Sequence, residues 1–153
     1  MFLKLTTSLF LAALSSEALA FQCYLTLVKD SCWMNYEVQI NVINSVDNSI
    51  LTTVTVPKGK PWVRQPFDCN PGTKLMYQAT FSPVFWESEK GKSYWAMTYW
   101  TLPEKIGAKE SAWDIPVCFA TAFSAVPFPP DATGNCKCNF LDIPPVLPSK
   151  PKS

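Results

Sequence analysis

The sequence predicts an all-β protein, namely a disulfide-braced antiparallel β-sandwich, with an open barrel as the second choice. Five stretches alternate apolar and polar residues with the period of two that a half-buried strand requires. No stretch longer than a few residues has the 3.6-residue period of an amphipathic helix. Six cysteines and 14 prolines in 153 residues fit short strands that are joined by ordered loops and braced by disulfides.

The first 20 residues have the three parts of a cleaved secretory signal. Lys4 supplies a short positive region, residues 5–14 an apolar stretch, and Ala18-Leu19-Ala20 a small-residue cleavage site. The apolar stretch is shorter than the roughly 20 residues that a membrane-spanning helix needs. We therefore expect a mature chain that begins at Phe21, lacks a transmembrane segment, and is periplasmic or secreted.

The mature chain has the length of one domain, which we place at residues 21–143. The clearest predicted strand covers residues 36–42, where four apolar side chains alternate with three polar ones. Residues 50–56 are rich in threonine and valine, which suit a pleated surface, and residues 46–49 have turn composition. These two strands therefore predict a hairpin, and residues 21–28 form a further candidate strand before it.

Three more strands are expected downstream, at residues 75–81, 94–101 and 117–123. The connection between the first two contains Gly91, which can adopt a positive φ in the predicted turn at residues 89–92. We expect a loop at residues 103–113, with at most one short helical turn. Residues 144–153 are rich in proline and predict a flexible, extended tail, for which docking to a partner is the alternative.

An even number of cysteines in an exported chain predicts a disulfide framework. The cysteines are Cys23, Cys32, Cys69, Cys118, Cys136 and Cys138. A bridge between Cys136 and Cys138, one residue apart, would be too tight. Because Cys23 and Cys32 are close in sequence, we expect them to pair with each other. Cys69 and Cys118 would then pair with the two C-terminal cysteines.

The absence of histidine excludes a Ser-His-Asp triad, a Cys-His pair and an imidazole metal site. Phosphate-binding loops and dinucleotide fingerprints are also missing. The formal net charge is +1 and the basic residues do not cluster, so we expect no nucleic-acid partner. No cofactor and no metal site are predicted. The alternative is a soft-metal carrier in which Cys136 and Cys138 bind an ion such as Cu(I), helped by methionines such as Met34, Met76 and Met97.

Aromatic residues concentrate in the second third of the chain, where five of the six tryptophans lie between Trp62 and Trp113. In the predicted strand 94–101, large rings occur on both faces. Either this strand is covered on both sides, or one set of rings is exposed and forms a binding surface. Ordinary core packing is the alternative to binding. The candidate binding residues are Trp86, Tyr94, Trp95, Tyr99 and Trp100.

Catalysis without histidine would depend on carboxylates. Glu87 and Glu89 could share one strand face, and Glu110 and Asp114 lie near Trp113 in sequence. A glycosidase needs two carboxyl groups about 5–10 Å apart, whereas the charged run at residues 87–90 more simply predicts a solvated hairpin tip. We therefore expect no catalytic residue.

Together these observations predict an exported, non-catalytic binding or interaction protein that acts through an aromatic-rich surface on a protein or a glycan. A small carboxylate-dependent hydrolase of polysaccharide is the first alternative. A soft-metal carrier is the second.

Overall fold

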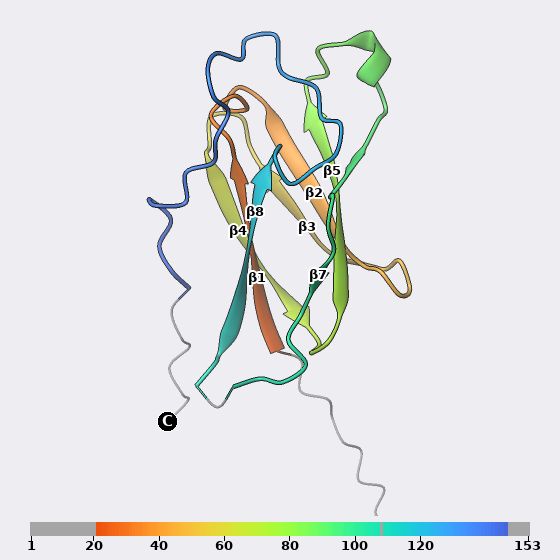
Figure 1. Ribbon diagram of the computed structural model, residues 1–153, viewed down its shortest axis with the longest axis vertical. Helices are drawn as coiled ribbons and strands as arrows, with labels where there is room; N and C mark the ends of the chain where they lie inside the picture. The colour runs from red at the N-terminus through yellow and green to blue at the C-terminus, as the bar shows by residue number, and fades with distance from the viewer. Residues whose placement is uncertain (1–20, 108, 147–153) are drawn as a thin grey trace, which may run out of the picture.

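The computed structural model describes residues 21–107 and 109–146 and consists of two β-sheets packed face to face, without closure into a barrel (Figure 1). The predicted all-β sandwich is therefore confirmed. One sheet has the order β4-β1-β8, formed by β1 (Phe21–Lys29), β4 (Trp62–Cys69) and β8 (Ala112–Phe119). The other has the order β3-β2-β5-β6, formed by β2 (Glu37–Asn44), β3 (Ile50–Val56), β5 (Lys74–Ser82) and β6 (Tyr94–Trp95).

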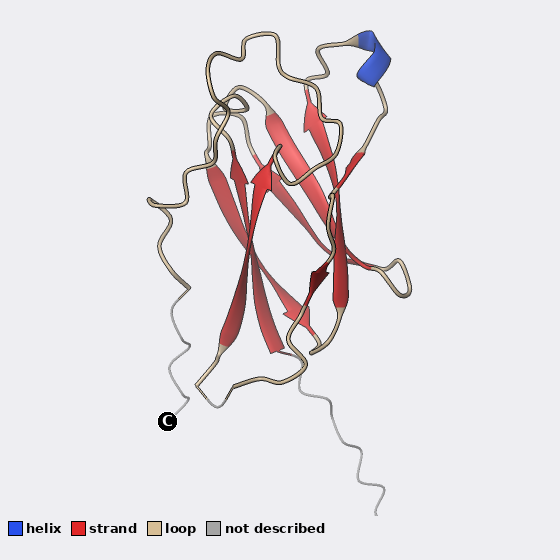
Figure 2. Ribbon diagram, in the orientation of Figure 1, coloured by secondary structure: helices blue, strands red, loops and turns tan. Residues whose placement is uncertain are grey.

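Two further elements complete the described chain. β7 (Trp100–Thr101) also pairs with β5, and η1 (Glu87–Glu89) is a single 3-10 turn (Figure 2). Four of the predicted strands correspond to β1, β2, β3 and β5 to within two residues. The predicted β2–β3 hairpin is present, with Asn48 at a φ of 60° in its turn. Gly91 has the expected positive φ, 76°.

The alternation pattern does not predict β4. Only Phe67 and Cys69 of this strand are buried, and Pro66 lies within it. Proline is tolerated because β4 is an edge strand: within the described residues it forms a ladder with β1 and with no other strand. Pro66 would disfavour a central strand, but it is compatible with an edge strand of the sheet.

The predicted last strand at residues 117–123 has the wrong bounds. The observed strand, β8, begins five residues earlier and pairs in parallel with β1. Its Pro116 again occupies an edge strand. After Phe119 the chain turns, because the backbone N–H of Ala122 donates to the Cys118 carbonyl at 3.0 Å.

The predicted strand at residues 94–101 is wrong over its middle, since β6 and β7 contain two residues each. The N–H of Ala96 still donates to the Tyr77 carbonyl of β5 at 2.9 Å, and at Met97 the backbone leaves β5. Here the chain bonds to the turn that follows β8. The N–H of Met97 donates to the Ala122 carbonyl, and the N–H of Ser124 donates to the Trp95 carbonyl, both at 3.0 Å. Because this partner lies far away in the sequence, the local alternation of apolar and polar residues does not indicate the pairing.

The core lies between the sheets and is built from rows of opposed apolar side chains. In one row Val54, Ile40, Ala79 and Tyr94 lie opposite one another on four neighbouring strands, and all four are buried. Trp33, in the β1–β2 loop, fills one end of the core, with its ring centroid 4.8 Å from those of Phe81 and Phe119. Since side chains alternate along a strand, the residues between these rows face outward.

Three disulfides use all six cysteines, which all lie in the described part of the chain. The pairs are Cys23–Cys69, Cys32–Cys136 and Cys118–Cys138. The last two cysteines pair with two separate parts of the domain, as predicted, and Cys118 pairs with one of them. The predicted Cys23–Cys32 pair is wrong, and so is the prediction that Cys69 pairs with a C-terminal cysteine. In the β1–β4 ladder Cys69 lies opposite Phe21 and Cys23 opposite Phe67, so the two sulfurs come from diagonal neighbours on the inward face.

The predicted signal, residues 1–20, and the last residues of the predicted tail, 147–153, lie outside the described residues. Phe21, the expected first residue of the mature chain, is the first residue of β1, and its ring centroid lies 4.5 Å from that of Trp113. Among the described residues, none of the helical structure is long and apolar enough to cross a membrane.

Candidate binding face

The outer surface of the β3-β2-β5-β6 sheet, which we call the open face, presents a row of polar side chains that ends at an indole. Thr53, Asn41, Gln78 and Trp95 lie directly opposite one another across the four strands. They alternate with the buried row that contains Tyr94, which places them on the outer side. Spaced at about 4.8 Å per strand, this row is roughly 14 Å long.

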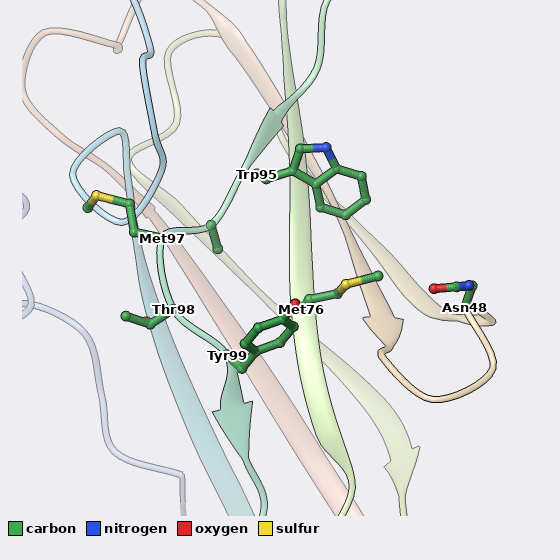
Figure 3. Close-up of a pocket in the computed structure, with 7 residues that line it drawn as sticks. Asn48, Met76, Trp95, Met97, Thr98 and Tyr99 are labelled. Atoms are coloured by element: carbon green, nitrogen blue, oxygen red, sulfur yellow. The ribbon is translucent and has the colours of Figure 1, made fainter.

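A cleft of about 550 Å³ lies at the aromatic end of the open face (Figure 3). Trp95 and Tyr99 lie with Met76 of β5 between them, and Asn48 approaches from the β2–β3 hairpin. Trp95 is 45% exposed and Tyr99 is 57% exposed. The Lys74 ammonium lies 4.3 Å from the centre of the Tyr99 ring. The cleft is therefore apolar, open, and lined by rings that solvent can reach.

The five predicted binding residues do not form one surface. Trp95 and Tyr99 line the cleft, whereas the Tyr94 ring stacks on Phe81 in the core with centroids 5.7 Å apart. Trp86 and Trp100 are exposed, but neither lines the cleft. Placing Tyr94 on the binding surface is thus wrong, because its side of the strand faces inward with Ala79.

The buried Tyr94 hydroxyl donates a hydrogen bond to Glu89. Burial first, and this carboxylate second, raise the pKa of Tyr94 above its ordinary value. Tyr94 thus anchors the η1 turn and holds β6 against the core, which fixes the position of its neighbour Trp95. Its role for the open face is positional.

Three polar or flexible residues of this face are absent from the predicted binding residues, namely Met76, Asn41 and Gln78. The alternation in β2 and β5 already places them on the polar side of their strands. The missing information is register, since only the pairing of Gln78 with Trp95 and of Asn41 with Gln78 shows that they form one surface.

Local hydrogen bonds orient the two amides of the row. Asn41 Oδ1 accepts from the Thr53 hydroxyl at 2.8 Å, and Gln78 Nε2 donates to the Ser93 hydroxyl at 2.8 Å. Within the described chain, the Asn41 amide N–H groups and Gln78 Oε1 have no protein partner. An available donor and an available acceptor therefore lie side by side on opposed residues.

The centre of the open face carries no charge. Among the strand residues that alternate onto it, the ionisable ones are Glu37, at the start of β2, and Lys74, at the start of β5. Because β2 and β5 are antiparallel, these two residues lie at opposite ends of the face. The neighbouring row of Thr55, Gln39 and Thr80 is also neutral.

The outer surface of the β4-β1-β8 sheet, which we call the covered face, has a different construction. Arg64 Nε donates to the Thr26 hydroxyl at 2.9 Å, and that hydroxyl donates to Asp114 Oδ1 at 2.6 Å. Arg64 Nη2 also lies 3.5 Å from Asp114 Oδ2. Arg64 and Asp114 are thus linked to each other and to Thr26 across three strands.

The C-terminal segment lies over this network. It descends alongside the β4-β1-β8 sheet in Figure 1, and Phe140, Ile143, Pro144 and Pro145 line a groove of about 500 Å³ together with Thr26, Arg64 and Asp114. The first two prolines of the predicted flexible tail therefore lie against the domain.

The carboxylates considered for catalysis mostly have structural partners. Glu89 accepts from Tyr94 and lies 3.7 Å from the Lys92 ammonium, and Glu110 accepts from the Trp113 indole at 2.8 Å. Asp114 belongs to the covered face. Glu87 is in the η1 turn.

Two further ionisable residues, Lys29 and Asp30, are buried at the end of the sandwich. The Lys29 ammonium donates to the carbonyls of Tyr36 and Pro57, both at 2.8 Å. Burial lowers the pKa of Lys29 to about 8, against a smaller raising effect of Glu37. Asp30, next to it, accepts from the N–H groups of Cys32 and Ala120 at 2.9 and 3.1 Å. Both groups stabilise loop backbone.

With all six cysteines in disulfides, no thiolate is available to bind a metal ion. Asp30, Cys32 and Cys136 bring one oxygen and two sulfurs within 4.8 Å of one another. The two sulfurs are bonded to each other, and Cys138 is bonded to Cys118. A soft-metal role for Cys136 and Cys138 would first require reduction of both disulfides.

Comparisons of the chain with models of known protein families, with characterised proteins and with solved structures gave no match.

Proposed function

We propose that this protein is an exported, non-catalytic binding domain that recognises its partner through the open face, with Trp95 and Tyr99 as its aromatic anchors. The observation that carries the proposal is the pair of large rings held at the edge of a neutral polar sheet face with half of their surface in solvent. Exposed aromatic side chains of this kind supply most of the binding energy in many interfaces.

The rigidity of the site supports a binding role. Tyr94, directly before Trp95, is fixed in the core, and the backbone of Trp95 bonds to Ser124. An aromatic ring on a fixed strand loses little conformational entropy when a partner covers it. The predominantly structural use of Glu89, Glu110 and Asp114 favours binding over carboxylate catalysis.

Export is supported by the secretory pattern of residues 1–20 and by the three disulfides, which persist in oxidising compartments. A periplasmic or extracellular partner follows from this location. The N-terminal sequence of the exported protein tests it, and we expect Phe21 as the first residue.

Hydroxyl-radical footprinting in the native compartment tests the binding role. The purified protein and the protein in its own envelope or culture fluid are oxidised side by side, and modification of each aromatic residue is measured by mass spectrometry. We expect Trp95 and Tyr99 to be protected in situ. Trp86 is 51% exposed but outside the cleft, so it is the internal control and should be oxidised equally in both samples. Equal oxidation of Trp95 in both would contradict the proposal.

A further inference from the structure

We infer that the ligand of the open face is a neutral glycan whose chain crosses the strands from Trp95 toward Thr53. This inference rests on the proposed function and adds the chemical class of the partner and its direction on the sheet. Three features of the row carry it: the position of the indole, the unused hydrogen-bonding atoms of the two amides, and the absence of charge.

The indole of Trp95 provides a flat apolar platform at one end of the row. Among the described residues Trp95 makes no ring–ring contact, and nearly half of its surface is exposed. The C–H face of a sugar ring is apolar and flat enough to lie on such a surface, while its hydroxyls point to the sides. A sugar stacked there would have its hydroxyls directed at the next residue of the row, Gln78.

The two amides beyond the indole match hydroxyl groups in particular. A hydroxyl is both a donor and an acceptor, so one sugar hydroxyl can accept from Asn41 Nδ2 and donate to Gln78 Oε1. Thr53 and Ser93 fix both amides in the orientation that leaves these atoms available. Opposed residues of antiparallel strands have Cβ atoms about 5 Å apart, a separation that one hydroxyl can bridge between two amide side chains.

The charge distribution selects a neutral glycan over an acidic one or a nucleic acid. The row Thr53, Asn41, Gln78, Trp95 and its neighbour Thr55, Gln39, Thr80 have no ionisable side chain. An anionic polymer gains affinity mainly from cations, and Lys74 lies at one end of the face with its ammonium over Tyr99. The row is about 14 Å long, which accommodates a short run of sugar units.

Affinity electrophoresis tests the inference with defined probes. The mature protein is run through gels that contain a soluble β-1,4-glucan, a xylan, a galactomannan or a dextran, with polygalacturonate as the acidic comparison. We expect retardation by at least one neutral polysaccharide, and weaker or no retardation by polygalacturonate. Free oligosaccharide of the retarding polymer should release the protein.

Three variants locate the binding. Trp95→Ala removes the platform, Asn41→Asp replaces the available donor while keeping the acceptor for Thr53, and Gln78→Met removes the available acceptor at similar length. For each variant, we expect the dissociation constant obtained from the retardation to rise by about tenfold. Trp86→Ala is the matched aromatic control, and Asn70→Asp, in the exposed β4–β5 turn, is the matched charge control. Both controls should bind like the unaltered protein.

The outcomes separate this inference from the proposed function. If no neutral polysaccharide retards the protein while Trp95 is still protected in situ, the open face binds a protein partner and the glycan inference is overturned alone. Retardation that survives Trp95→Ala, Asn41→Asp and Gln78→Met would also overturn it, because the glycan would then bind elsewhere. Preferential binding of polygalacturonate would overturn the assignment of a neutral ligand.

Discussion

The two outer faces of this sandwich treat their polar groups in opposite ways. On the covered face, Arg64, Thr26 and Asp114 bond to one another across three strands, and the C-terminal segment lies over them. On the open face, Asn41 and Gln78 are each held by one local hydrogen bond and direct their remaining polar atoms outward. Polar groups that satisfy one another stabilise a fold, whereas oriented groups without an internal partner are available to a ligand.

The disulfides reinforce the same division. Cys118–Cys138 attaches the C-terminal segment to the end of β8, and Cys32–Cys136 attaches it to the β1–β2 loop. The strands of the open face, β2, β3, β5 and β6, contain no cysteine. Covalent bracing is thus confined to the sheet that the segment covers and to the loops at the end of the sandwich.

The largest expected effect comes from removing one of the two disulfides that attach the C-terminal segment, namely the one at the end of β8. The double variant Cys118→Ser with Cys138→Ser opens a loop with a sequence separation of 20, and we expect it to lower the free energy of unfolding by about 3 kcal/mol. Urea denaturation measures this loss. Glycan retardation should be unchanged while the protein is folded, and a loss of binding would show that the two faces are not independent.

Trp95→Ala should have the converse effect. It removes an exposed ring, so we expect the dissociation constant of the retarding glycan to rise by at least about tenfold, with a change in unfolding free energy below about 1 kcal/mol. Titration calorimetry and thermal unfolding measure the two quantities. A large loss of stability with unchanged affinity would mean that Trp95 is a structural residue.

A pair of isosteric substitutions compares the hydroxyls of the two faces. Thr26 is buried and bonds to both Arg64 and Asp114, so Thr26→Val should lower the free energy of unfolding by about 1–2 kcal/mol. Thr53→Val, which removes one exposed hydrogen bond to Asn41, should change it by less than about 0.5 kcal/mol. Urea denaturation of both variants provides the comparison, and equal losses would contradict it.

The smallest expected effect depends on pH. Hydrogen bonds from Asn35 and Tyr36 hold the pKa of Asp131 below its usual value of 3.8. A carboxyl group whose pKa is lower in the folded state stabilises the protein above its unfolded pKa, and this contribution disappears as the pH falls through the folded value. Stability measured below pH 4 should therefore fall less steeply in Asp131→Asn than in the unaltered protein. Identical slopes would show that these bonds do not favour the ionised form.

Local pattern is sufficient for the strands that bury one face completely. β2 and β5 alternate because one side packs on the core and the other meets water, so their bounds follow closely from the sequence. The same pattern fails at the edges. β4 contains Pro66, and the chain between β6 and β7 takes its backbone partner from Ala122.

The binding face could be predicted only in part, for the same reason. An exposed set of rings at residues 94–101 is one of two predicted outcomes, and Trp95 and Tyr99 are exposed although residues 96–99 do not continue the strand. That Asn41, Gln78 and Trp95 form one row depends on register between three strands, which a single sequence does not specify. The Cys23–Cys69 disulfide could not be predicted for the same reason, because it depends on the pairing of β4 with β1, which was not predicted.

The most direct test of the difference between the two faces is a ¹H–¹⁵N NMR titration with an oligosaccharide of the retarding neutral polymer. We predict that the side-chain amide signals of Asn41 and Gln78 and the indole signal of Trp95 shift with a common dissociation constant, while the Arg64 Nε signal remains unchanged. Shifts confined to Arg64 and the C-terminal segment would place the ligand on the covered face and contradict the account.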